Sequence, residues 1–240
     1  MRTEMKRLSC TVVMLLALAG AAVAQEVGRA VATLEASVPS TGHHVLGTAL
    51  YDQTDSPAGA ALASQVFEPA SSLFDCRAGD DFTVPVPDIQ WDIGGLDVLG
   101  AYVGGPGPTP LVDVEFFGDG GGLPGASMCS YLALAAGTDF LDDGAGNLTI
   151  TLPTPCSLTA GDYWVSVRAD MDLATGGQWL WQMRSVQAGA EFAWENPPDG
   201  FGTGCVVWAP AGSCGASGAD LLFALDGGAV PVELQSITIE

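Results

Sequence analysis

Tryptophans concentrated in the last third of the chain are the first side chains that could bind a ligand. Trp179 and Trp181 stand two residues apart, and residues at that spacing share one face of an extended chain. Their rings could form a platform that stacks on the faces of sugars. The same rings could instead fill a protein interior, and the glutamines that alternate with them favour that interpretation. The candidate residues for a carbohydrate-binding surface are Trp164, Trp179, Trp181 and Trp194.

A run of carboxylates and glycines further back supplies a candidate calcium loop. Ca²⁺ prefers oxygen ligands, and Gly144 and Gly146 permit the tight curvature that such a loop needs. The same letters also build an ordinary solvated hairpin turn, and the absence of a complete calcium-loop motif favours the turn. No other cofactor is expected. The candidate Ca²⁺ ligands are Asp139, Asp142, Asp143 and Asn147.

Residue types that usually carry catalysis are scarce in this chain. Its two histidines, His43 and His44, are adjacent, so in a strand they would point in opposite directions, and neither has the spacing of a triad base. The chain has no G-x-S-x-G, H-E-x-x-H or phosphate-binding loop motif. A glycosidase with paired carboxylates stays open, because the separation that decides it is three-dimensional. We expect a protein that is not an enzyme.

The start of the chain, residues 1–24, has the pattern of a secretory signal peptide. Arg2, Lys6 and Arg7 precede an apolar run at about residues 11–22, and small residues follow it. This run is too short for a membrane anchor, which needs about 20 apolar residues. We expect cleavage after Ala24 and export to the outside of a bacterial cell, with no membrane span.

The charge of the chain is strongly one-sided. It has 28 acidic and 7 basic residues, which gives a formal net charge of −21. Such a chain would be repelled by phosphate backbones and by anionic membrane surfaces, so we expect no nucleic-acid partner. An acidic surface of this kind also resists aggregation. An extracellular glycan or protein remains as the expected kind of partner.

Five cysteines follow the signal segment, and an exported protein reaches an oxidising compartment. Cys205 and Cys214 flank a short turn and are placed to close a small loop. Cys129 lies in a predicted strand and Cys156 in a predicted corner, so their pairing would tie a loop to the sheet. Each bridge would contribute about 3 kcal/mol. Cys76 is then unpaired, either as a small buried hydrophobic residue or as an intermolecular partner.

The elements that must position these residues are predicted to be β-strands. Apolar residues alternate with polar ones over 112–116, 148–152 and 163–167, which is the period of half-buried strands. About ten short strands, separated by turns rich in glycine and proline, favour an all-β, two-sheet antiparallel sandwich, jelly-roll-like or Ig-like, over a closed barrel. The predicted organisation is a signal peptide at 1–24, an N-terminal extension at 25–44, a β-sandwich domain at 45–228 and a C-terminal tail or strand at 229–240.

Two local expectations follow from composition. The stretch at 147–171 is expected to hold two strands joined by a proline-rich corner that carries Cys156. The segment at 58–64 consists of small residues and is expected to be a loop.

Several segments resemble a module of secreted, uncharacterised bacterial proteins. They include 49–53 (ALYDQ), 79–82 (GDDF), 158–167 (LTAGDYWVSV) and 194–205 (WENPPDGFGTGC). The strand at 158–167 is also similar to strands in jelly-roll accessory domains of secreted enzymes and adhesins. The similarity covers most of residues 45–226, and its motifs are turns and strands. The resemblance implies an extracellular β-sandwich and brings no active site with it.

Taken together, these patterns predict a secreted, non-enzymatic β-sandwich for extracellular interaction, adhesion or matrix structure. The alternative is a carbohydrate-binding module that uses the tryptophan-rich strands, and a secreted hydrolase of unknown type comes third. Residues 237–239 alternate at the end of the chain, and we expect this tail to pair with an edge strand of a neighbour, giving self-association.

Overall fold

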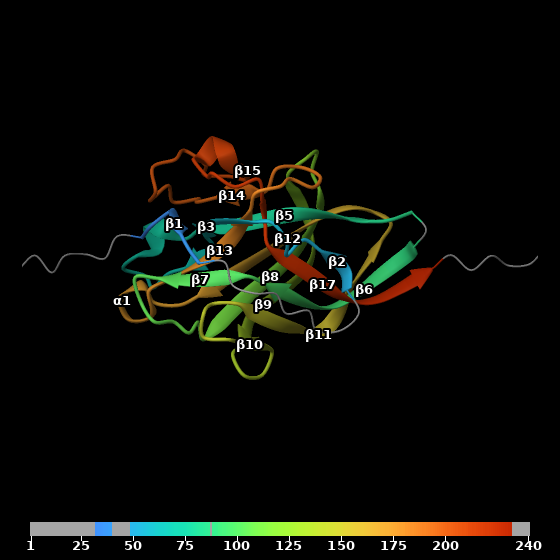
Figure 1. The fold of residues 1–240 in the computed structure, drawn as a ribbon, viewed down its shortest axis with the longest axis horizontal. Coiled ribbons are helices and arrows are strands. Elements are labelled where there is room, and N and C mark those ends of the chain that lie inside the picture. Colours follow the sequence, from blue (N-terminus) through green and yellow to red (C-terminus); the bar gives the residue numbers. More distant parts are fainter. Residues whose placement is uncertain (1–31, 40–48, 87, 232–240) are drawn as a thin grey trace, which may run out of the picture.

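The computed structural model describes residues 32–39, 49–86 and 88–231 (Figure 1). The predicted signal segment, the histidine pair and the predicted pairing tail at 237–239 lie outside the described residues. Within the described part, strands dominate and the helical elements are single turns. These turns are η1 (Ser72–Phe74), α1 (Leu173–Gly176) and η2 (Ala211–Cys214).

One layer of the fold is a seven-stranded sheet with β12 (Gly161–Asp170) near its centre. Val165 and Val167 of this strand are fully buried on the inward side, and alternation sends Ser166 and Arg168 to the opposite side. The order across the sheet is β15 (Ala209–Pro210), β14 (Ala193–Glu195), β5 (Arg77–Val84), β12, β8 (Leu111–Asp119) and β9 (Pro124–Ala135), with β4 (Gln65–Val66) beside β12.

The opposite layer consists of two five-stranded sheets, named here the β13 sheet and the β6 sheet. The β13 sheet contains β1 (Glu35–Ser37), β3 (Pro57–Ala63), β13 (Gln178–Arg184), β16 (Asp220–Leu221) and β7 (Gly100–Val103). The β6 sheet has the order β10 (Phe140–Asp142), β11 (Leu148–Thr159), β6 (Asp88–Val98), β17 (Phe223–Pro231) and β2 (Ala49–Asp52).

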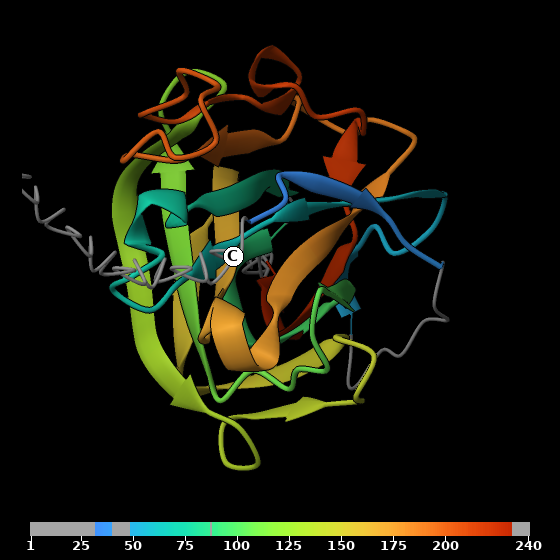
Figure 2. The ribbon, with the colours of Figure 1, turned by 90° about the vertical axis from the view of Figure 1, so that its left-hand side faces the viewer.

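These two sheets form one continuous layer, because the chain crosses between them twice. β6 runs through Leu99 into β7, and β16 runs through Leu222 into β17. At the junction the N–H of Leu99 donates to the carbonyl of Leu222 at 3.1 Å, and the N–H of Gln182 donates to the carbonyl of Leu99 at 2.8 Å. Apart from a short parallel pairing of β4 with β12, the strand pairs are antiparallel. The protein is therefore an all-β sandwich of packed sheets and not a closed barrel, which confirms the predicted fold class (Figure 2).

The core fills the space between the inward faces of the two layers. Phe82 and Phe116 of the seven-stranded sheet meet edge to face, with ring centroids 6.2 Å apart. Phe82 also stacks on Trp91 of the β6 sheet at 6.4 Å. All three rings are at most 4% exposed. Burying a side chain of this size contributes about 2–3 kcal/mol, so ring contacts of this kind hold the layers together.

A buried hydrogen-bond network centred on Asp80 joins all three sheets. Asp80 of β5 accepts hydrogen bonds from the side-chain amide of Gln53 at 2.6 Å and from the N–H of Leu221 at 2.7 Å. The same amide of Gln53 donates to the carbonyl of Leu221 at 2.8 Å, and the hydroxyl of Tyr51 donates to Gln53 Oε1 at 2.7 Å. Buried polar groups are costly unless they are paired, so this network fixes how the sheets are placed relative to one another.

Asp220 lies next to this network and is also fully buried. Its Oδ2 accepts from the N–H of Ala188 at 2.5 Å and lies 3.6 Å from Arg184, whereas its Oδ1 has no partner among the described residues. Burial raises the pKa of Asp220, and burial together with the nearby Asp220 charge raises the pKa of Asp80.

Both predicted disulfides are present. Cys129–Cys156 connects β9 of one layer to β11 of the other, and Cys205–Cys214 closes a loop with a sequence separation of 9. Cys76 is a free, buried thiol, and burial raises its pKa to about 12. At neutral pH it therefore stays protonated and packs as a small hydrophobic residue.

Two local expectations were wrong. The small-residue segment at 58–64 falls largely in β3, which pairs with β1 and β13. The stretch at 147–171 does hold two strands, β11 and β12, but the proline-rich segment does not join them. It is a break inside β11, which pairs with β6 on both sides of an irregularity between Thr151 and Cys156. Proline has no N–H to give to a ladder, so the strand bulges there and resumes its pairing beyond.

Candidate functional site

The outward face of the seven-stranded sheet carries a row of charged side chains that cross from strand to strand. The strand register places Glu195 of β14 opposite Arg77 of β5, and Asp113 of β8 opposite Arg168 of β12. Arg77 and Arg168 belong to the small set of basic residues in an acidic chain. We call this side of the sheet the outer face.

Arg77 lies at the centre of the row and is held by two carboxylates. Its Nε donates to Glu195 Oε1 at 2.6 Å, and its Nη1 donates to Glu115 Oε2 at 3.0 Å. Arg168 donates from Nε and Nη2 to one oxygen of Asp113, both at 2.9 Å. The side chains of Arg77 and Arg168 remain 26% and 32% exposed, so their guanidinium groups are reachable from solvent.

Aromatic rings fix the plane of the Arg77 guanidinium. Its carbon lies 4.8 Å from the ring centroid of Trp208 and 5.5 Å from that of Phe117. Gly79 lies under the indole, since a Cβ built there would lie 3.4 Å from Trp208 Cη2, at van der Waals contact. Contacts between guanidinium and aromatic rings are worth about 0.5–2 kcal/mol, so Arg77 is held in one orientation before any ligand arrives.

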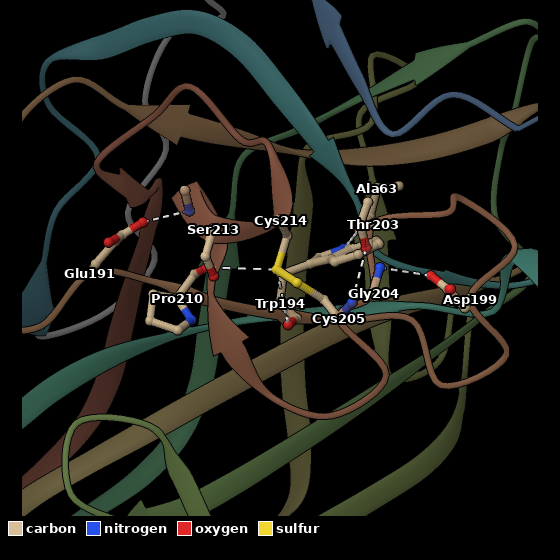
Figure 3. The surroundings of a disulfide bond; sticks show 11 residues. Ala63, Glu191, Trp194, Asp199, Thr203, Gly204, Cys205, Pro210, Ser213 and Cys214 are labelled. Atoms are coloured by element: carbon tan, nitrogen blue, oxygen red, sulfur yellow. Dashed lines mark hydrogen bonds between the residues drawn. A yellow bond between two sulfur atoms is a disulfide. The ribbon is translucent and has the colours of Figure 1, made fainter.

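Trp208 reaches the outer face from the loop that the Cys205–Cys214 bridge closes. Figure 3 shows this bridge beside Trp194, whose carbonyl lies 3.9 Å from the sulfur of Cys214. The indole N–H of Trp194 donates to the carbonyl of Ala63 at 2.8 Å, which anchors the base of the loop in the core. The disulfide therefore connects a rigid interior to the ring that orients Arg77.

A hollow of about 340 Å³ opens beside Arg77, and we call it the Arg77 hollow. Each of the two arginines that line it keeps one terminal nitrogen without a partner among the described residues, Nη2 of Arg77 and Nη1 of Arg168. Asp75 uses Oδ1 to accept the N–H of Phe67 at 2.8 Å, and burial raises its pKa. The hollow is lined by Asp75, Cys76, Arg77, Arg168, Glu195, Pro197 and Pro198.

The outer face continues to β9, the edge strand seen along one side of the molecule in Figure 2. This strand has 12 residues, none of them charged. Met128 and Leu132 are 53% and 64% exposed, and Leu132 lines a small depression together with the two arginines. Cys129–Cys156 and a 2.8 Å hydrogen bond from the Tyr131 hydroxyl to the carbonyl of Thr154 hold the strand in place.

The four tryptophans proposed from the sequence are interior residues. Trp179, Trp181 and Trp194 are 0% exposed, and Trp164 is 1% exposed. The indole N–H groups of Trp179 and Trp181 donate to main-chain carbonyls at 2.8 and 3.0 Å. Trp164 packs in a small cluster with Phe117, and its N–H donates to a carboxylate at 3.1 Å. None of these four rings presents a face on which a sugar could stack.

The carboxylates of the candidate calcium loop accept hydrogen bonds from the loop itself and from neighbouring strands. Asp143 accepts from the N–H groups of Ala145 and Asn147 at 2.8 and 3.1 Å and from the Asn147 side chain at 2.7 Å. Asp142 accepts the N–H of Gly144 and the hydroxyl of Tyr102. Asp139 accepts the N–H of Ala135 at 2.8 Å. Within the described residues, no three acidic, histidine or cysteine side chains are grouped so that they could hold a metal ion.

A second hollow, of about 370 Å³, lies beside that loop. Its walls include Leu141, which is 64% exposed, and Asp97, whose Oδ1 accepts the hydroxyl of Thr149 at 2.7 Å. No arginine is found among its described lining residues, whereas two arginines line the Arg77 hollow. The Arg77 hollow therefore has the richer set of groups for recognising a polar ligand.

Neither Arg77 nor Trp208 is among the site residues predicted from the sequence. The signal that could have found them is the scarcity of arginine in so acidic a chain, since each one needs a local reason. A further clue is that Trp208 falls inside the small Cys205–Cys214 loop. Loops held by a rigid scaffold often carry binding residues.

Comparisons with protein-family models, with curated proteins and with solved structures find no match to this chain. Within the described residues, no helix is long and apolar enough to cross a membrane. Fold and site together define the class of the protein. It is a disulfide-bonded all-β sandwich with a charged and aromatic face on one of its sheets.

Proposed function

We propose that this protein is a secreted, non-enzymatic contact protein that serves extracellular adhesion or matrix structure through the outer face of its seven-stranded sheet. The observation that carries the proposal is the uncharged β9 edge of that face, with Leu132 and Met128 open to solvent. The disulfide chemistry and the signal pattern at 1–24 support an extracellular place of action.

The physical argument rests on charge. A net charge of −21 keeps copies of the chain apart and keeps them away from anionic surfaces. Natural edge strands are usually protected by charged residues or proline, whereas β9 has only Pro124 at its start and no charge along its length. On a molecule that otherwise repels anionic surfaces, the uncharged β9 edge is where another surface can make contact with the least repulsion.

The proposal is tested by retention on solid extracellular polymers. Labelled mature protein is applied to films of cellulose, chitin, peptidoglycan and collagen, and retention on each is measured after washing at fixed salt. We expect retention on at least one film, and we expect Leu132→Asp to reduce it by about fivefold or more, since a charge would then occupy the contact surface. Val86→Asp is the matched control, because Val86 is 84% exposed in the turn after β5.

Two results would contradict the proposal. One is the absence of retention on every film, and the other is an equal loss for Leu132→Asp and Val86→Asp. Release of soluble sugar or peptide from a film by the wild-type protein would support the hydrolase alternative instead. Asp80 and Asp220 are both 0% exposed, which argues against their serving as the paired carboxylates of a hydrolase.

Carbohydrate binding is the second candidate function, and a specific feature favours it. That feature is the Arg77 hollow on the same outer face, in place of the tryptophan-rich strands. Its lining combines charged groups with two prolines.

A further inference from the structure

We propose that the Arg77 hollow binds one residue of a neutral saccharide. The inference rests on the proposed function, because the hollow opens on the same outer face, and it adds the chemical class of the ligand. Its starting point is the set of groups that the folded protein leaves unused next to the hollow.

The residues that line this hollow carry both donors and acceptors. Nη2 of Arg77 and Nη1 of Arg168 are donors without a partner among the described residues. Glu195 uses Oε1 for Arg77, and Asp75 uses Oδ1 for the N–H of Phe67, so each carboxylate retains a second oxygen that can accept. A sugar hydroxyl both donates and accepts, so adjacent hydroxyls can satisfy a guanidinium and a carboxylate together.

The charge of the lining selects against ions. Within the hollow, Arg77 and Arg168 face Asp75 and Glu195, and Glu115 and Asp113 add two more carboxylates just outside it. An anion would meet this local excess of carboxylates in a chain of net charge −21. A cation at Glu195 would have to displace the Arg77 guanidinium that already holds this carboxylate. A neutral ligand rich in hydroxyl groups has neither cost.

Size and preorganisation agree with such a ligand. The hollow has about 340 Å³, at the lower end of the roughly 300–1,000 Å³ that small-molecule sites have. Pro197 and Pro198 form one wall with apolar rings that suit the C–H face of a sugar. Arg77 is already oriented by Trp208 and Phe117, so little side-chain entropy is lost on binding.

The experiment is isothermal titration calorimetry of the mature protein with four separate ligands, cellotetraose, maltotetraose, xylotetraose and mannotetraose. We expect at least one to bind. Arg168→Gln and Glu195→Gln should each weaken that binding by about tenfold, because each removes a charged hydrogen-bonding group. Asp162→Asn is the control. Asp162 is an exposed carboxylate on β12, the strand of Arg168, and it accepts a hydrogen bond from Thr83 outside the hollow. The affinity of this variant should equal that of the wild type.

Three results would overturn the inference. They are no heat of binding with any of the four sugars, unchanged affinity in Arg168→Gln, and tighter binding of a free amino acid or of glucuronate than of every neutral sugar. Near-UV circular dichroism checks the fold of each variant. Should Arg168→Gln fail to fold, Arg168→Lys decides by the same tenfold criterion, because lysine keeps the charge and lacks the planar fork.

The two proposals can fail separately. Retention on films that depends on Leu132, together with no sugar binding, would leave the contact function and remove the saccharide. Sugar binding that depends on Arg168, together with retention that ignores Leu132, would leave the saccharide site and remove the adhesive role of β9.

Discussion

Strand β5 presents two polar networks on its opposite sides, and they differ in what they leave unsatisfied. On the inward side, Asp80 meets Gln53 and the main chain of Leu221 with no arginine among its hydrogen-bond partners. On the outward side, Arg77 is shared between Glu115 and Glu195 and stays 26% exposed. The inner network fixes the sheets and is closed to solvent, whereas the outer one retains unused donors. One alternating strand thus carries a stabilising network on one side and the groups of the proposed saccharide site on the other.

The largest effect is expected where the inner network is cut. Asp80→Ala leaves the Gln53 amide and the N–H of Leu221 buried without their acceptor, so we expect a loss of about 3 kcal/mol in the free energy of unfolding. Asp80→Asn keeps one carbonyl acceptor and should cost about 1 kcal/mol. Urea denaturation at pH 7 measures both. Equal losses for the two variants would show that the hydrogen bonds are not what the network contributes.

A smaller effect is expected from pH. Burial raises the pKa of Asp80 and Asp220, and it raises the pKa of Asp81 to about 6. With a raised folded-state pKa, the folded protein keeps its proton while the unfolded chain ionises near pH 4, so stability is lost as pH rises from there through the raised values. The protein should therefore be more stable at pH 5 than at pH 8, by on the order of 2 kcal/mol.

The control for this pH effect is Asp220→Asn. It keeps an acceptor for the N–H of Ala188 and cannot ionise, so the difference in unfolding free energy between pH 5 and pH 8 should shrink. An undiminished difference would place the effect in the general acidity of the surface instead of in this group.

The smallest effect on stability is expected on the outer face. Arg168 pairs with Asp113 while 32% exposed, and ion pairs of that kind contribute about 0–1 kcal/mol. Arg168→Gln should therefore change the urea midpoint little, in contrast to Asp80→Ala. A loss as large as that of Asp80→Ala would erase the distinction between the two sides of β5.

The sequence was sufficient for much of the fold, because alternation is a local signal. The pattern at 163–167 predicted a strand, and β12 is one, with Val165 and Val167 facing the other layer. The expectation that this strand is half-buried was wrong, because residues 163–167 are all buried and the cluster of Trp164 with Phe117 and Trp208 covers the outward side. Spacing and compartment were also enough for both cysteine pairs.

The rest depends on distant partners. The expected loop at 58–64 is the strand β3, since small residues there pair with the bulky β13, where Trp181 stands opposite Leu62. A strand of alanines needs no bulk of its own when its neighbour supplies it. The candidate site has the same origin, because Arg77 and Trp208 come together only when the disulfide loop folds over Gly79. No local sequence pattern predicts the contact between Arg77 and Trp208.

The position of β17 has a mechanical consequence for the proposed contact function. This strand is bonded along both of its edges, to β6 on one side and β2 on the other, and its ladder with β6 extends from Phe223 to Pro231. The bonds of an antiparallel ladder run perpendicular to the strands. Tension applied to the chain at Pro231 would therefore load these bonds in shear, so that they resist together instead of opening one by one.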